Sequence, residues 1–214
     1  MRTTLRMFMV PVAVVVLGAA AGCSSDNGGK DAMKGKPVAE VCDGFAKDTP
    51  ALDALKAIAG DGDFADDRSL PDETLKALRE ADGELTTKEL ASGTPLCRLQ
   101  AAKDGESALD IDFREALVVP KGRDRSTFSY FITGEDALSA NRFAKILFEC
   151  RMKEPAKKII VAAELERSNK SEAAVKDLPG LQITVLNAAA RKVAADLGCQ
   201  NDTKLVSGVP KPAA

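Results

Sequence analysis

The chain of 214 residues contains no histidine and no tryptophan, and it has only one tyrosine. Histidine is the most frequent general acid or base in enzymes, so its absence removes most hydrolytic constellations. The sequence also lacks a GxSxG nucleophile elbow, a GxGxxG dinucleotide fingerprint and a Walker-type phosphate loop. We therefore expect a protein that is not an enzyme and needs no cofactor. Carboxylate-dependent or lysine-dependent catalysis is the less favoured alternative.

Long apolar runs are also scarce, and the longest lies at the N-terminus. Arg2 and Arg6 precede an apolar segment at residues 7–17, and small residues follow at 18–22. This order is typical of a secretory signal peptide. A transmembrane anchor is the alternative, but the run contains Pro11 and is shorter than the roughly 20 apolar residues that a spanning helix needs. We predict a signal peptide at residues 1–22.

A lone cysteine follows these small residues. Ala20, Ala21, Gly22 and Cys23 resemble the lipobox of bacterial lipoprotein precursors, in which leucine is commoner where Ala20 stands. The resemblance implies cleavage before Cys23 and a diacylglyceryl group on its thiol. Two acyl chains suffice for stable anchoring, whereas one does not. The protein is thus expected on the extracytoplasmic face of the cell membrane, held there by lipid. Its layout is similar to that of small, cysteine-paired envelope lipoproteins of high-GC Gram-positive bacteria, a likeness that assigns no residue.

Composition divides the rest of the chain into three parts. Residues 23–36 are polar and rich in glycine, and we expect them to form a flexible tether with a root-mean-square span of about 20 Å. Residues 37–205 are long enough for a single domain with its own core. Residues 206–214 contain Pro210 and Pro212, and we expect them to be a disordered tail.

The charge balance is mildly acidic. Removal of residues 1–22 takes two of the 30 basic residues and none of the 32 acidic ones, which leaves a net charge of −4. Nucleic-acid binding depends on a basic surface, so we expect no nucleic-acid partner.

Four further cysteines lie in the expected domain, namely Cys42, Cys97, Cys150 and Cys199. An even number of cysteines in an exported chain is typical of disulfides. Zinc binding is the alternative, but the chain has no CxxC spacing and no histidine, so we expect no metal site. Four cysteines allow three connectivities.

The periodicity predicts an α+β fold. N-terminal helices are expected near residues 39–46, from Thr49 to Gly60, and from a cap formed by Ser69 and Asp72 to Gly83. Period-two alternation then predicts about five antiparallel strands, near residues 97–101, 109–113, 128–133, 144–152 and 159–166. A final amphipathic helix is expected at residues 178–197, capped by Gly198 and packed on one face of the sheet.

This arrangement favours one disulfide pairing. Cys150 is expected to point toward the sheet face that the final helix covers, and Cys199 follows the cap of that helix. We therefore favour a Cys150–Cys199 bridge, and by elimination a Cys42–Cys97 bridge.

Two acidic groups are candidate sites. Asp61, Asp63, Asp67 and Asp72 occupy positions 1, 3, 7 and 12 of a calcium-loop template, but the glycine and the final glutamate of that template are missing. An ordinary acidic loop explains them without an ion. Asp110 and Asp112 share one strand face, where a solvated sheet surface is the favoured interpretation.

These observations predict a membrane-anchored extracytoplasmic lipoprotein that acts as a non-catalytic binding or interaction module in the cell envelope, with an envelope protein as its expected partner. The first alternative is a carrier of a hydrophobic ligand or lipid. A carrier would need a cavity between the final helix and the sheet, where we expect a packed core. The second and less favoured alternative is an envelope enzyme without a histidine.

Overall fold

The structure is a computed structural model that describes residues 34–47, 49–82, 93–117, 124–168 and 176–214. These residues belong to one unit, Asp31–Ala214. The signal peptide, Cys23 and the tether up to residue 33 lie outside the described residues. So does Gly83, the expected end of the second long helix.

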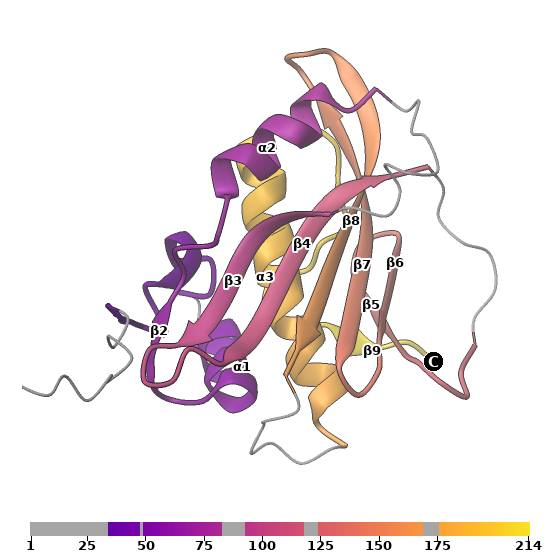
Figure 1. Ribbon diagram of the computed structural model, residues 1–214. Helices are drawn as coiled ribbons and strands as arrows, with labels where there is room; N and C mark the ends of the chain where they lie inside the picture. The colour runs from indigo at the N-terminus through magenta and orange to yellow at the C-terminus, as the bar shows by residue number, and fades with distance from the viewer. Residues whose placement is uncertain (1–33, 48, 83–92, 118–123, 169–175) are drawn as a thin grey trace, which may run out of the picture. The chain divides into compact units, whose positions relative to one another are not determined.

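Within the described residues, nine antiparallel strands form one sheet in the order β1-β2-β3-β4-β8-β7-β6-β5-β9 (Figure 1). The strands are β1 (Lys36–Pro37), β2 (Asp63–Ala65), β3 (Thr94–Ala101), β4 (Ser107–Ala116), β5 (Ser129–Ile132), β6 (Asp136–Ser139), β7 (Phe143–Met152), β8 (Lys157–Arg167) and β9 (Lys211–Pro212). The helices are α1 (Thr49–Ala59), α2 (Pro71–Glu80), α3 (Leu178–Leu197) and the short 3-10 helix η1 (Val41–Gly44).

The expected α+β fold with about five strands is wrong, because the sheet has nine strands and the protein is mostly β. The five expected strands correspond to β3, β4, β5, β7 and β8. The missed strands β1, β2, β6 and β9 contain only two to four residues each. Strands of two or three residues, such as β1, β2 and β9, carry too few side chains to show an alternating pattern.

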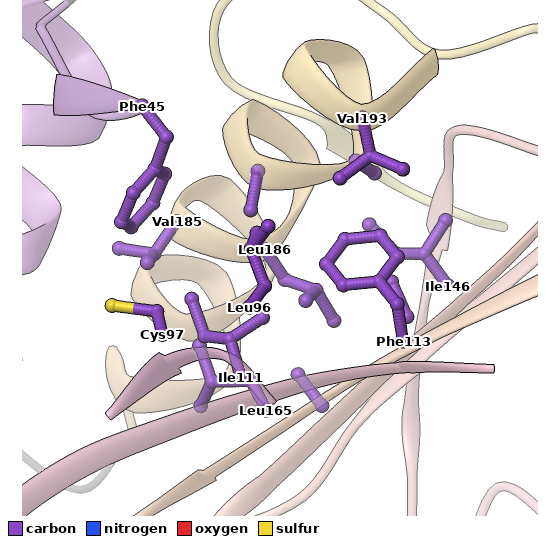
Figure 2. Packing of buried hydrophobic residues seen from close by; sticks show 14 of the residues in the cluster. Phe45, Leu96, Cys97, Ile111, Phe113, Ile146, Leu165, Val185, Leu186 and Val193 are labelled. Atoms are coloured by element: carbon purple, nitrogen blue, oxygen red, sulfur yellow. The ribbon is translucent and has the colours of Figure 1, made fainter. Parts of the chain in front are cut away.

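The long central strands direct successive side chains to opposite faces of the sheet. In the cross-strand row at the centre of the sheet, Phe113 pairs with Ala163, and Ala163 pairs with Ile146. All three are buried. Figure 2 shows Phe113 and Ile146 on the side of the sheet that faces α3, close to Leu186 and Val193. The small Ala163 separates two large side chains in this row, so large and small residues alternate beneath the helix.

Helix α3 occupies the residues that the sequence predicts. Pro179 lies in its first turn, and Gly198 ends it in the left-handed conformation with φ of 69°. Glycine adopts this conformation without a steric penalty. The helix packs along one face of the sheet, against β6, β7 and β8 (Figure 1). Val185, Leu186 and Val193 are 0% exposed, so side chains fill the space between α3 and the sheet, as expected.

The N-terminal helices differ from expectation. The helix expected near residues 39–46 is only the four-residue 3-10 helix η1, in which Cys42 and Asp43 have positive φ. Helix α2 ends at Glu80, three residues before the expected Gly83. Ser69 does not cap α2, which begins at Pro71 without a side-chain cap. The Ser69 hydroxyl instead accepts a hydrogen bond from the backbone N–H of Arg98 at 2.9 Å. Leu70 donates its backbone N–H to the carbonyl of Pro95 at 2.8 Å. The residues before α2 are therefore hydrogen-bonded to one edge of β3. If the Ser69 hydroxyl capped α2, it would not be available to the N–H of Arg98.

Both disulfides have the pairing expected from the sequence. Cys42 is joined to Cys97, and Cys150 to Cys199, with Cα–Cα distances of 5.5 and 5.0 Å. The first bridge ties η1 to β3, and the second ties the end of α3 to β7. Each closes a loop of about 50 residues, which contributes about 4 kcal/mol to stability in the chain-entropy model.

Each end of the sheet is a two-residue strand with the sequence Lys-Pro, Lys36–Pro37 in β1 and Lys211–Pro212 in β9. Lysine and proline at an edge oppose further strand pairing. The segment 206–214 is thus not the tail that its prolines predict, because β9 pairs with β5. Proline is tolerated there because one side of an edge strand pairs with no other strand, so a missing N–H on that side removes no hydrogen bond. Similarly, Lys36 of the expected tether belongs to β1.

Candidate functional site

The five cysteines fall into two groups. Cys23, the expected lipidation site, lies outside the described residues. The other four form the two disulfides, and their sulfur atoms are therefore structural.

Asp66 makes the main polar contacts of the acidic loop after α1. Strand β2 (Asp63–Ala65) interrupts the calcium-loop template. Asp66 accepts the backbone N–H of Cys42 at 2.7 Å and pairs with the Lys36 ammonium at 2.9 Å. Burial on its own would raise the pKa of Asp66, but these hydrogen bonds and the Lys36 charge outweigh burial and lower it. In the part of the chain that the structure describes, no three acidic or cysteine side chains gather in a way that could hold a metal ion.

Asp110 and Asp112 lie together on the sheet face opposite α3, where both meet Arg98. Arg98 Nη2 donates to Asp112 Oδ1 at 2.6 Å, and Arg98 Nε lies 3.6 Å from Asp110 Oδ1. Burial is the main cause that raises the pKa of Asp110, the Arg98 charge opposes it, and neighbouring carboxylates add to it. This pair is part of a charged sheet face, as the sequence predicts.

A second ion cluster on this face centres on Glu164. Arg114 Nη2 and Lys145 Nζ each lie 2.8 Å from the same oxygen, Glu164 Oε1. Burial would raise the pKa of Glu164, but the hydrogen bond and charge of Lys145, together with Arg114, lower it overall. The cations and anions of this face thus neutralise one another across β4, β7 and β8.

The other side of the molecule contains an open, mostly apolar cleft of about 620 Å³. We call it the α3 cleft, because the first turn of α3 forms one of its walls. The first half of α1, strand β5 and the C-terminal segment form the rest. Apolar side chains and proline rings contribute most of the lining, among them Pro50, Ala54, Phe131, Leu181, Val209 and Pro212. This volume lies within the range of small-molecule sites, roughly 300–1,000 Å³.

Local sequence signals position each wall. Pro50 and Pro179 stand in the first turns of α1 and α3, where a missing N–H is tolerated. Phe131 pairs with Pro212 across β5 and β9, and Ala213 donates its N–H to the Tyr130 carbonyl at 2.8 Å. The C-terminal segment is therefore held as a wall of the cleft.

The polar side chains of the lining are either solvent-exposed or already bonded. Asp53, Lys176 and Asp177 are exposed. Thr184 is buried, and its hydroxyl donates to the Gly180 carbonyl at 2.7 Å. By contrast, the apolar Val209 is 59% exposed. The α3 cleft thus combines accessible apolar surface with few buried polar groups that need a partner.

A smaller cleft of about 480 Å³ lies at the opposite end of α1. It is lined by Gly35, Gly60, Gly62 and Lys103, among others, and it borders β1, where the described chain begins. We call it the glycine cleft. The lining residues of the two clefts that are nearest along α1, Ala54 and Ala59, are separated by a rise of about 7.5 Å.

Sequence reasoning missed the α3 cleft. Its lining comes from four segments between Pro50 and Pro212, and one of them was expected to be disordered. The available signal was the presence of Val209 among prolines, since an apolar residue in a polar tail is a reason to expect packing.

In the described residues, no helix has the length and apolarity required to cross a bilayer. Comparisons with protein-family models, with curated proteins and with solved structures find no match.

Proposed function

We propose that this protein is a lipid-anchored, extracytoplasmic, non-catalytic binding module, and that the α3 cleft is its binding site. The observation that carries the proposal is the cleft itself, an open volume of about 620 Å³ with accessible apolar walls. Concave, mostly apolar clefts of this volume are the usual places where proteins bind small ligands.

Two features support the cellular setting. The two disulfides suit an oxidising compartment, where exported proteins mature. The resemblance of residues 20–23 to a lipobox supplies an anchor at Cys23. A tether of about ten residues then confines the domain near the membrane, so that even a weak site meets its ligand at a raised effective concentration.

The anchor is tested by mass spectrometry of the protein made in a lipoprotein-competent bacterium. The mature N-terminus should be Cys23 with a diacylglyceryl group. Cys23→Ala should release the protein from the membrane or leave it uncleaved. A membrane-bound protein with an unlipidated N-terminus elsewhere contradicts the proposal.

The binding site is tested by site-specific photocrosslinking in cells. A benzophenone amino acid replaces Val209 in the α3 cleft, and the matched control replaces Leu117, which is apolar and 43% exposed outside the cleft. Val209 should give a discrete adduct that Leu117 does not give. Identical products from both positions, or none from either, contradict a binding role for the cleft.

A further inference from the structure

The lining of the α3 cleft restricts what it can hold. Pro50, Pro179 and Pro212 have no N–H, and the Thr184 hydroxyl already donates within α3. The other hydroxyl of the lining, that of Ser129, is at the solvent-exposed part of the cleft. An extended peptide would bring N–H and C=O groups into the cleft, and these groups need hydrogen-bond partners when they are buried. A hydrocarbon chain brings no such groups. The walls therefore favour an acyl chain over a peptide backbone.

The mouth of the cleft suits the polar end of such a ligand. The charged lining residues Asp53, Lys176 and Asp177 are all exposed to solvent, whereas Ala54 and Phe131 are buried. A ligand with one apolar chain and one hydrated end would match this division, because its chain leaves water while its head group keeps its hydration.

On these grounds we infer that the α3 cleft binds one acyl chain of a bilayer lipid. The inference rests on the proposed binding function and names its ligand. The expected tether of about ten residues has a root-mean-square span of about 17 Å, which keeps the domain near the membrane. Two acyl chains are expected on Cys23, and both are needed for stable anchoring. The surrounding bilayer lipids supply many more acyl chains than these two. Mass action therefore favours a separate lipid over the protein's own anchor.

Gly180 allows the cleft to be filled without disturbing the fold. It lines the cleft in the first turn of α3, and no heavy atom lies within 4 Å of the position that a Cβ would take. Gly180→Phe therefore adds a Cβ without a clash, and its ring is expected to extend into the cleft that Gly180 lines. Gly62 is the matched control, since it lines the glycine cleft and has equally open surroundings.

The test uses the lipidated full chain in vesicles of phosphatidylglycerol and phosphatidylethanolamine. A trace of the phosphatidylethanolamine carries a diazirine in the middle of one acyl chain. After illumination, peptide mapping should place the lipid adduct on residues 176–184 and 209–214. Gly180→Phe should lower the adduct yield about tenfold, because displacing two methylenes costs that much affinity. Gly62→Phe should leave the yield unchanged.

Three outcomes would overturn the inference. Labelling that is spread over the surface, or unchanged in Gly180→Phe, means that the chain does not enter the cleft. A cleft that stays unlabelled in the lipidated chain but is labelled when the unanchored Cys23→Ala chain is added to the same vesicles means that the protein's own acyl chains occupy it. An unlabelled cleft in all variants, with Val209 crosslinked to a protein in cells, refutes the acyl ligand but retains the binding function. If that crosslink is also absent, the proposed function fails as well.

Discussion

Removal of the Cys150–Cys199 bridge is expected to cost about 4 kcal/mol of unfolding free energy. The bridge spans 49 residues, and closing a loop of that length removes this amount of chain entropy from the unfolded state. The double variant Cys150→Ala/Cys199→Ala should nevertheless remain folded. Next to the bridge, Gln200 donates its N–H to the Arg151 carbonyl at 2.9 Å, and the Asn201 side chain accepts the Arg151 N–H at 2.7 Å. These bonds keep the end of α3 beside β7.

The assay is equilibrium unfolding in urea, followed by circular dichroism at pH 7. The predicted loss corresponds to a decrease in Tm of roughly 8–16 °C for a domain of this size. The m-value should rise, because an unbridged unfolded chain exposes more surface. The variant Cys42→Ala/Cys97→Ala is the comparison, since its loop spans 55 residues and predicts almost the same loss. A loss below about 1 kcal/mol with an unchanged m-value would refute the loop-closure reasoning.

Two further predictions concern substitutions of single residues. Asp66→Asn should lose roughly 1.5–3 kcal/mol at pH 7, as expected for hydrogen bonds to a charged group, while the exposed Asp67→Asn should lose almost nothing. Because folding lowers the pKa of Asp66, its contribution is present above the unfolded pKa of about 3.9 and disappears as pH falls through the lower folded value. Urea melts from pH 7 to pH 2 should therefore show a weaker acid dependence in Asp66→Asn, and an unchanged dependence would contradict this. Gly134→Ala should destabilise more than Gly208→Ala by about 1–3 kcal/mol, because both glycines have positive φ but a Cβ at Gly134 would lie 2.4 Å from the Leu147 carbonyl oxygen. Equal losses in thermal melts of the two variants would argue against this close contact.

Local signals in the sequence account for the elements that were predicted correctly. Helix α3 has an apolar stripe over 20 residues and a glycine at its end, and its bounds agree with the prediction. Strands β7 and β8 alternate toward both ends, although three successive residues are buried in the middle of each. The disulfide pairing followed from the face on which Cys150 lies, which alternation also determines.

The missed features depend on contacts between distant segments. Strand β2 has three residues, and its pairing with β3 comes from the chain that folds back beside Gln100 and Ala101. Ser69 could cap α2, but the N–H of Arg98 on β3 competes for its hydroxyl. The α3 cleft requires β9, which forms only because β5 offers an edge. None of these contacts has a periodic signature in the sequence.

The central claim is that the α3 cleft is occupied when the protein works in the cell envelope. The most direct test is photocrosslinking from Val209 in living cells, compared between the native chain and Gly180→Phe, with anchoring and expression matched. The account predicts a discrete adduct in the native chain that is lost when the ring fills the cleft. An adduct of equal yield in both chains would contradict it.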